Sequence, residues 1–315
     1  MKSRRSFDVV TVTLNPAIDR TLTISNFAVG KVNRVESVRE DAGGKGVNVA
    51  TALADFGFSI AVTGFLGTDN AAVFENLFAR KKIIDHFVRL TGPTRVGIKI
   101  TDPAQEQTTD VNFPGLSPNA AAVKRLFRSI VSMANEKPQW FVLGGSLPPK
   151  VNVEIYGELI STLKRRGHKV LLDTSGQPFR HGIEAAPNII KPNLHELEEL
   201  IGKSLKSDRA IIQAARQLIA GGVELVVVSI GERGACFVTE QEAIIARPPR
   251  VKVKSTVGAG DAMVAGIIAA HLRHESLEDC ARLATAFSLE TLTCIDRSLR
   301  SPAAVKNWRK RVKIF

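Results

Sequence analysis

The chain has 315 residues, of which 44% are hydrophobic, and it carries a formal net charge of +12 at pH 7. Its length and apolar content suffice for one large α/β domain, whereas a single Tyr and two Trp argue against a protein that stacks single-stranded bases. The three cysteines lack zinc-site spacing, so we expect reduced thiols in a cytoplasmic protein. No apolar stretch nears the roughly 20 residues of a membrane span, so we expect no membrane partner.

The positive charge is dispersed along the sequence, apart from a basic run near the C-terminus. That run contains Arg309, Lys310, Arg311 and Lys313, and it is typical of a solvated tail. We therefore expect no nucleic-acid partner. A basic surface would also steer small phosphorylated substrates toward a cleft.

Short β-branched apolar runs alternate with helical patterns along the chain. Such runs are typical of strands buried on both faces, and they occupy residues 9–12, 60–63, 140–143, 170–172, 188–190 and 225–228. Helices are predicted between them, for example at residues 47–56 and 154–166, each followed by a glycine. The alternation predicts an α/β fold with a mostly parallel sheet flanked by helices, in which sites lie at the carboxyl ends of the strands.

Two segments, at about residues 20–38 and 94–113, interrupt this alternation. The first alternates polar and apolar residues around Gly30, and the second is typical of an antiparallel hairpin. Together they predict a small β-sheet lid inserted into a single domain that spans residues 1–315. Such a lid could cover a substrate or pair with a second subunit.

Loops after the early strands carry the first candidate site residues. Residues 15–19 follow the first predicted strand, and Asp19 is the last of them. Polar side chains at such a position can bind sugar hydroxyls, although a plain turn is the alternative. Gly43 and Gly44 precede Lys45 at a helix start, and Asn48 follows in that helix. Glycines permit a close backbone approach and a lysine supplies a point charge, so this loop indicates phosphate binding; a flexible loop is the alternative.

Two middle loops continue this pattern. Ser146 follows the strand at 140–143 and could donate a hydrogen bond to a phosphate oxygen. Asn193 and Glu196 follow Lys191, and their spacing suits Mg²⁺ held through waters. The same spacing also suits a helix N-cap with a capping Glu, and the sequence leaves both interpretations open.

The last two loops complete the set. Ser229, with Gly231 and Gly234, closes the strand at 225–228 in a turn against which a nucleotide could lie. Gly258, Ala259 and Gly260 precede Asp261 and an apolar helix. A helix start with free N–H groups and a carboxylate at its edge suits phosphoryl transfer to an alcohol, although a capped turn is the plainer interpretation.

All these motifs fall at the ends of predicted strands, so they should converge on one edge of the sheet. With this convergence, the sequence resembles the PfkB, or ribokinase-like, carbohydrate kinases over nearly its whole length. The glycines at 43–44 with Asn48, and the stretch 257–261, look like the two signatures of that family. Stretches 13–19, 42–46, 64–70 and 94–99 are similar to the members that act on phosphorylated ketohexoses.

The resemblance implies a ribokinase-like fold and ATP-dependent phosphorylation of a sugar phosphate with Mg²⁺. It implies that Asp261 is the base and that residues 258–260 form the anion hole. The implied sugar ligands are Asp19, Gly43, Gly44 and Asn48, and the implied ligands of the substrate phosphate are Lys45, Arg95, Lys31, Lys99 and Ser146. The implied nucleotide ligands are Lys191, Asn193, Ser229, Gly231, Gly234 and Gly260, and the implied Mg²⁺ ligands are Glu196 and Asn193.

The resemblance further implies a homodimer formed through the lid. The chain departs from the family pattern at two places: the late run of small residues near adenine is here 284–288 followed by the bulkier Glu290, and Phe113-Pro114 stands where some relatives carry a basic lid residue. The sequence leaves open which ketohexose phosphate is used. It also leaves open a catalytically silent sugar-phosphate sensor, although such a sensor would need neither Asp261 nor Glu196.

Overall fold

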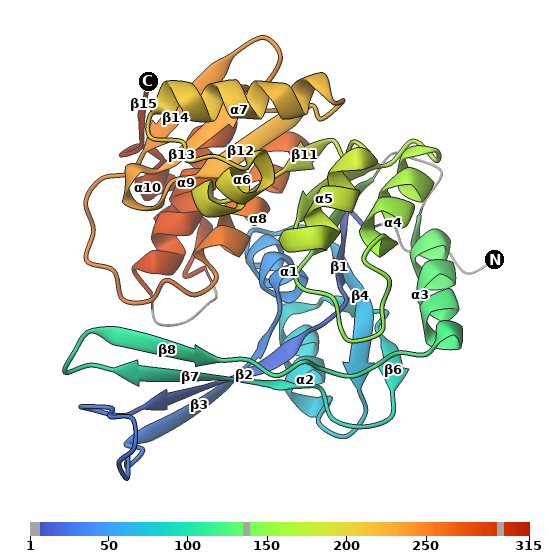
Figure 1. The fold of residues 1–315 in the computed structure, drawn as a ribbon, viewed down its shortest axis with the longest axis vertical. Coiled ribbons are helices and arrows are strands. Elements are labelled where there is room, and N and C mark those ends of the chain that lie inside the picture. The colour runs from blue at the N-terminus through green and yellow to red at the C-terminus, as the bar shows by residue number, and fades with distance from the viewer. Residues whose placement is uncertain (1–6, 135–138, 295–298) are drawn as a thin grey trace.

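The computed structural model describes residues 7–134, 139–294 and 299–315. An 11-stranded sheet forms its centre, as Figure 1 shows, with the order β15-β14-β13-β12-β11-β10-β9-β1-β4-β5 and with β6 also paired to β4. The parallel strands are β1 (Val9–Thr13), β4 (Ile60–Gly67), β5 (Ile84–Asp85), β6 (Val88–Leu90), β9 (Trp140–Gly144), β10 (Lys169–Asp173), β11 (Ile189–Ile190) and β12 (Leu225–Ser229). This arrangement confirms the predicted α/β fold.

Helices cover both faces of the sheet. One face packs against α1 (Lys45–Asp55), α2 (Ala72–Lys81), α8 (Ala259–Leu272), α9 (Leu277–Leu292) and α10 (Pro302–Arg309). The other packs against α3 (Ala120–Met133), α4 (Ile155–Lys164), α5 (Gly176–Glu184), α6 (Leu194–Ile201) and α7 (Asp208–Ala220). Successive strand residues alternate between the two cores: Val227 faces one and its neighbours Val226 and Val228 face the other. Both faces are therefore apolar, which explains the uninterrupted hydrophobic runs.

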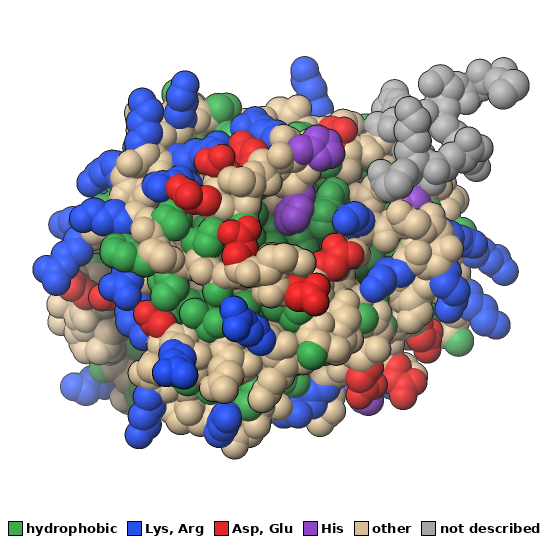
Figure 2. Space-filling model, turned by 90° about the horizontal axis from the view of Figure 1, so that it is seen from above, with side chains coloured by type: hydrophobic (Ala, Val, Ile, Leu, Met, Phe, Trp, Pro, Cys, Tyr) green, Lys and Arg blue, Asp and Glu red, His purple; other side chains and the backbone are tan. Residues whose placement is uncertain are grey.

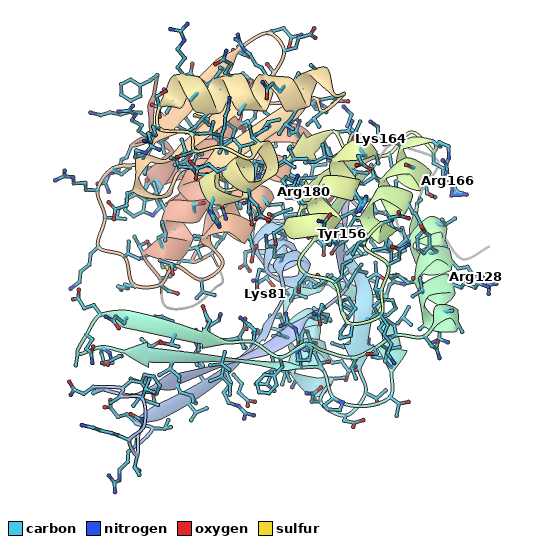
Figure 3. The ribbon with its side chains drawn as sticks, viewed as in Figure 1. Lys81, Arg128, Tyr156, Lys164, Arg166 and Arg180 are labelled. Atoms are coloured by element: carbon cyan, nitrogen blue, oxygen red, sulfur yellow. The ribbon has the colours of Figure 1, made fainter. Side chains whose placement is uncertain are left out.

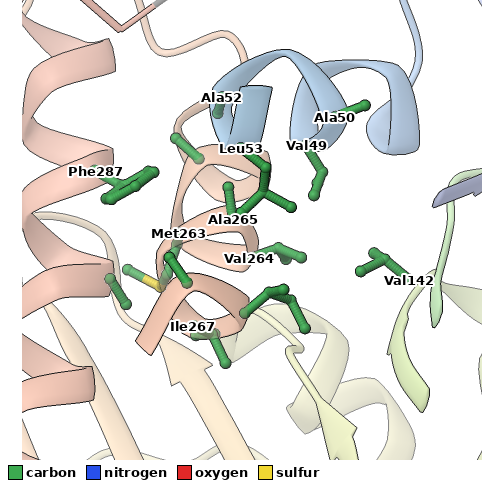
Figure 4. Packing of buried hydrophobic residues seen from close by; sticks show 14 of the residues in the cluster. Val49, Ala50, Ala52, Leu53, Val142, Met263, Val264, Ala265, Ile267 and Phe287 are labelled. Atoms are coloured by element: carbon green, nitrogen blue, oxygen red, sulfur yellow. The ribbon is translucent and has the colours of Figure 1, made fainter. Parts of the chain in front are cut away.

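Helix α8 is enclosed on all sides, so it lacks the polar stripe of a surface helix. Met263, Val264 and Ala265 pack between α1 and α9, as Figure 4 shows. Close packing of α8 on α9 requires Gly266, because a Cβ there would lie 2.6 Å from the Cα of Ala284. The helix that begins at the glycine-rich loop is thereby fixed in the core.

An antiparallel extension at one edge of the sheet was not predicted from the sequence. A 3₁₀ turn (Gly231–Arg233) reverses the chain after β12, and β13 (Ala235–Val238), β14 (Ala243–Arg247) and β15 (Lys313–Ile314) follow in antiparallel order. Strand β15 joins from the far end of the chain, a pairing that no local pattern specifies. No helix within the described ranges is both long enough and apolar enough to cross a lipid bilayer.

A second sheet of four strands projects from the main body (Figure 1). Its order is β3-β2-β7-β8, with β2 (Ala17–Thr23), β3 (Ser37–Gly43), β7 (Val96–Asp102) and β8 (Gln107–Val111). Strands β2 and β7 run parallel, while β3 and β8 pair with them antiparallel at the two edges. The predicted small β-sheet is confirmed. Because β1 is followed almost directly by β2 and β3 leads into α1, this lid adjoins the carboxyl end of the central strand.

Candidate active site

The N-terminus of α8 carries the candidate base. Gly258 precedes the helix with a φ of 80°, a left-handed conformation that favours glycine, and Ala259 and Gly260 open the first turn. N–H groups of a first helical turn have no intrahelical partner, so they face whatever lies in front of the helix. Asp261 follows them and is 8% exposed. Burial, and next the nearby carboxylate of Asp173, raise the pKa of Asp261 to about 6.

The start of helix α1 meets that carboxylate. Asn48 donates a hydrogen bond from Nδ2 to Oδ2 of Asp261 over 2.7 Å. Gly44 caps α1 with a φ of 115°, and a Cβ at this position would lie 2.8 Å from Cγ2 of Thr13. Glycine therefore lets the loop pass close against β1. The two glycine-rich segments singled out in the sequence thus meet at one point.

A buried charge cluster adjoins Asp261. Lys45 forms an ion pair through Nζ with Oδ1 of Asp173 at 2.9 Å, and Lys191 approaches the same oxygen at 3.6 Å. Burial alone would raise the pKa of Asp173, but Lys191 and Lys45 together hold it below its usual range. For Lys45, burial opposes the charged form, yet Asp173 and then Asp261 leave its pKa raised. Two ammonium groups and two carboxylates therefore balance each other in a confined space.

Asp173 is a functional candidate that the sequence reasoning missed. It stands at the end of β10 and is 2% exposed, and its backbone carbonyl accepts a hydrogen bond from Gly145 N. The available signal was a carboxylate directly after the apolar run 170–172, the same strand-end position that identified the other motifs. It was overlooked because no glycine-rich loop accompanies it.

Arg95 lies at the base of the lid and is half-buried. Its Nε and Nη2 donate to the backbone carbonyl of Asn15 at 3.3 and 3.1 Å, and its Nη1 donates to that of Phe113 at 3.1 Å. Burial lowers the pKa of Arg95, an effect that Asp19 opposes. These carbonyl contacts fix the guanidinium near Asp19, one of the predicted sugar ligands.

The side chain of Asn15 links the lid to the loop after β9. Its Nδ2 donates to the carbonyl of Pro114 at 3.1 Å and lies 3.3 Å from Oγ of Ser146. On the other side of that loop, the hydroxyl of Tyr156 donates to the carbonyls of Gly144 and Gly145; Figure 3 labels this residue on α4. Ser146 is thus exposed at the end of a loop held from two directions.

The predicted nucleotide side is built on α6 and β12. Asn193 caps α6, accepting from Glu196 N at 2.8 Å, while Oε2 of Glu196 accepts from Asn193 N at 2.9 Å. This is the capping box that the sequence allowed. A bridge pairs Asn193 with Ser229. Gly234 has a φ of 95°, and a Cβ there would lie 1.9 Å from the carbonyl oxygen of Ala246, so packing alone requires this glycine.

Within residues 7–134, 139–294 and 299–315, no three His, Cys, Asp or Glu side chains gather to form a protein-only metal site. Mg²⁺ seldom has such a site; it keeps several waters and shares one or two carboxylates with substrate phosphates. Glu196 is close enough to act on the charge of Lys45. This donor set fits a magnesium ion that arrives with a nucleotide.

Two predicted phosphate ligands lie apart from this cluster. Lys31 is exposed in the connection between β2 and β3, at the outer end of the lid. Lys99 lies on β7, where its Nζ pairs with Oδ1 of Asp110 across the hairpin at 2.9 Å. The structure therefore brings Lys45 and Arg95 to the inner end of the lid but leaves Lys31 and Lys99 on the lid itself.

The departure at Glu290 has a structural explanation. Glu290 is fully buried in α9, and its carboxylate accepts bonds from Arg300 Nε at 2.6 Å and from Trp308 Nε1 at 2.9 Å. The Glu290 carboxylate therefore holds α10, and the residues just before it, against α9. Upstream, Ser288 Oγ donates to the carbonyl of Ala259 at 2.7 Å, which ties α9 to the candidate anion cradle.

A sheet of this topology, with glycine-rich helix starts and a buried carboxylate at its carboxyl edge, defines a ribokinase-like phosphotransferase fold. The chain belongs to the pfkB family of carbohydrate kinases, whose pattern it matches over residues 10–303. It is 45% identical to a 1-phosphofructokinase of Rhodobacter capsulatus over 93% of each chain, and 39% identical to that of Escherichia coli strain K12 over 88% of each. The crystal structure of phosphofructokinase-2 from Escherichia coli with potassium superposes with a TM-score of 0.90 at 27% identity, covering 96% of this chain and 98% of the other.

Proposed function

We propose that this protein transfers the γ-phosphoryl group of ATP to the 6-hydroxyl of fructose 1-phosphate, giving fructose 1,6-bisphosphate and ADP. The observation that carries the proposal is the buried Asp261 at the α8 N-terminus, bonded to Asn48 and flanked by Lys45 and Lys191. The choice of substrate rests on similarity to 1-phosphofructokinases, at 45% identity for the relative from Rhodobacter capsulatus.

Asp261 would accept the proton of the acceptor hydroxyl. A pKa of about 6 leaves the carboxylate ionised at neutral pH, yet more basic than an ordinary aspartate. Its bond from Asn48 fixes the carboxylate, and N–H groups of residues 258–260 would stabilise charge on the transferred phosphoryl group. Positioning and charge neutralisation would contribute more than the proton transfer itself.

Lys45 and Arg95 would hold the phosphate that the substrate already carries, while Asp19, Gly43, Gly44 and Asn48 hold its sugar. An ammonium has three donors, so the pairing of Lys45 with Asp173 leaves others for a phosphate oxygen. Three N–H groups of Arg95 are bound to carbonyls, which orients the remaining ones. Ser146, Lys31 and Lys99 remain candidates for further contacts, the two lysines after movement of the lid or from a partner subunit.

Lys191, Asn193, Ser229, Gly231 and Gly234 would line the nucleotide side. Mg²⁺, when bound with ATP, would supply positive charge that offsets the negative charge of the phosphates. Oε2 of Glu196 takes part in the capping box, so the other carboxylate oxygen would orient the waters bound to Mg²⁺. Asn193 would lie beside them. We further propose a cytoplasmic location, which the three free, buried cysteines support.

The test is a coupled ADP-release assay with ATP and Mg²⁺ on fructose 1-phosphate, fructose 6-phosphate and tagatose 6-phosphate in parallel. A clear preference for fructose 1-phosphate is the expected result. Preference for a 6-phosphate would keep the mechanism and refute the substrate. Absence of activity on all three, with folded protein, would refute the proposed kinase activity in favour of a sugar-phosphate sensor.

We also propose a homodimer formed through the four-stranded lid. Apolar side chains exposed on this sheet and its connections support it: Val29 (92%), Val32 (84%), Val38 (59%), Phe113 (47%) and Val111 (44%). Sedimentation of the wild type against a Val38→Asp, Val111→Asp double variant tests this surface. We expect a dimer and a monomer respectively; a wild-type monomer, or a dimer in both proteins, would refute it.

A further inference from the structure

A strongly basic groove lies away from the proposed active site, between α10 and the ends of α8 and α9. Five cationic side chains line it, Arg273, Arg282, Lys306, Arg309 and Lys310, and its volume is about 690 Å³. Among the described residues, no carboxylate belongs to its lining, and Pro302 and Ala303 form its apolar wall. Figure 2 shows Lys and Arg gathered along the left-hand flank, the side on which α10 and β15 lie in Figure 1.

Three of the five cations are held in place by the protein. Arg309 forms paired bonds with the carboxylate of Glu275, both at 3.0 Å, and contacts Asp279 at 2.8 Å. Arg282 binds Glu278 at 2.9 Å, and the guanidinium of Arg273 stacks over Phe56 at 4.2 Å from the ring centroid. Rigid guanidinium groups lose little side-chain entropy when they bind an anion.

Lys306 and Lys310 differ from Arg282 and Arg309 in that no carboxylate compensates their charge. Lys306 lies on α10 and Lys310 at its C-cap, one turn apart; both are exposed, and within the described ranges neither has a carboxylate partner. Their repulsion at i and i+4 is unfavourable, and an anion placed between them would relieve it. The groove therefore combines guanidinium groups that are held in place, those of Arg309 and Arg282 by carboxylates, with two ammonium groups that are not compensated.

We infer that this groove binds a small anion that bears several phosphate groups. A concave site of this volume suits a compact ligand, and the multiple cations favour more than one phosphate. An extended nucleic-acid backbone fits less well than a compact anion, because it would continue beyond the lysines and meet the exposed carboxylates of Glu278 and Asp279 as well. The inference is independent of the proposed kinase activity.

Tryptophan resonances give a local test. The chain has two tryptophans, and Trp308 lies on α10, where its indole N–H donates to Glu290, while Trp140 is buried on β9. Protein labelled with ¹⁵N-tryptophan would be titrated with inorganic tripolyphosphate and, separately, with fructose 1,6-bisphosphate. We expect a saturable shift of the Trp308 indole signal, with Trp140 as the internal reference. The tighter ligand distinguishes a continuous phosphate chain from two phosphates separated by a sugar.

The decisive variant is Lys306→Glu with Lys310→Glu, which should weaken binding by about tenfold or more because two attractions become repulsions. The matched control is Lys124→Glu with Arg128→Glu, another exposed i, i+4 pair, on α3 at the opposite side of the molecule, where Figure 3 labels Arg128. The control should bind like the wild type. No saturable shift, or equal affinity in both double variants, would overturn the inference. Tighter binding of a DNA duplex through the same lysines would overturn the choice of a small anion.

Discussion

The side-chain amide of Asn48 donates a hydrogen bond to the carboxylate of Asp261 across 213 residues of sequence. This contact joins the helix start that follows the first glycine-rich loop to the one that follows the last. It engages Oδ2 of Asp261, and in the proposed mechanism the other carboxylate oxygen would accept the proton of the acceptor hydroxyl. In the proposed mechanism both glycine-rich segments therefore serve a single site: one would hold the acceptor and the other the phosphoryl group.

Asp261→Asn should lower kcat by roughly 10²–10⁴ while leaving the fold intact, because the amide cannot accept the proton. Steady-state kinetics and circular dichroism would measure this. The corresponding amide change at an exposed carboxylate, Glu240→Gln, should leave turnover unaltered. Wild-type-like turnover in the Asp261 variant would rule out its role as base.

The same Asp261→Asn variant should be more stable than the wild type at pH 7.5. The pKa of Asp261 is raised in the folded protein, so its contribution to stability is present below its unfolded pKa and is lost as pH rises toward about 6. Removing the buried charge should increase the free energy of unfolding by on the order of 1–3 kcal/mol at pH 7.5, and by little at pH 4. Urea denaturation at both pH values measures the difference; a variant less stable at pH 7.5 would contradict it.

As the pH is lowered, kcat/KM should fall along an acid limb with an apparent pKa near 6, because Asp261 becomes protonated. Asp173→Asn should shift that limb to lower pH, because it removes a negative charge that raises the pKa of Asp261 and leaves Lys45 and Lys191 in place. Asp85→Asn, which changes a carboxylate paired with Arg89 at the far edge of the sheet, should not move it. If the apparent pKa of this limb is unchanged or higher in the Asp173 variant, the limb does not report Asp261.

Two glycine-to-alanine changes in α8 should separate function from packing. Gly260→Ala meets only Lys191 Nζ at 3.6 Å, so it should not destabilise the fold, but its methyl group would enter the anion cradle and lower kcat/KM for ATP by about tenfold or more. Gly266→Ala would contact the backbone of Ala284 at 2.6 Å and should cost about 1–3 kcal/mol of stability. Kinetics with urea titrations on both variants would test the pair, and the reverse pattern would refute it.

Arg95→Ala should weaken the phosphosugar complex by about 1.5–3 kcal/mol, because a charged hydrogen-bond donor to phosphate is lost. The loss should appear mainly as a raised KM for the sugar phosphate. Arg20→Ala is the matched control, since Arg20 is an exposed arginine on β2 that pairs with Glu40 on the lid itself. An unchanged KM in the Arg95 variant would count against the assignment.

Glu290→Gln should destabilise the protein by about 1–3 kcal/mol, because the fully buried carboxylate is the charged acceptor for both Arg300 and Trp308. The fluorescence of Trp308 should shift to the red as its surroundings loosen. Glu278→Gln, an exposed member of the Arg282 pair on the same helix, should cost less than about 0.5 kcal/mol. Equal effects of the two changes would show that the buried carboxylate does not anchor the C-terminal segment.

The sequence alone determined the architecture and the edge at which the site is found. Uninterrupted, β-branched apolar runs such as Val226–Val228 are typical of strands buried on both faces, and parallel strands bring the loops that follow them to one edge. It also predicted Asp261, Asn48 and Lys45 as candidate site residues, because glycine-rich helix starts are local patterns. The lid followed from local alternation in the same way.

Only the tertiary structure decided how these residues act on one another. The pairing of Asp173 with Lys45 and Lys191, the raised pKa of Asp261 and the anchoring of Arg95 on Asn15 all depend on residues distant in sequence. The addition of β15 to the sheet and the burial of Glu290 against Trp308 depend on the C-terminal segment folding back. Hydrophobic periodicity is a property of neighbouring residues, whereas desolvation and charge pairing arise only when the chain has brought its distant parts together.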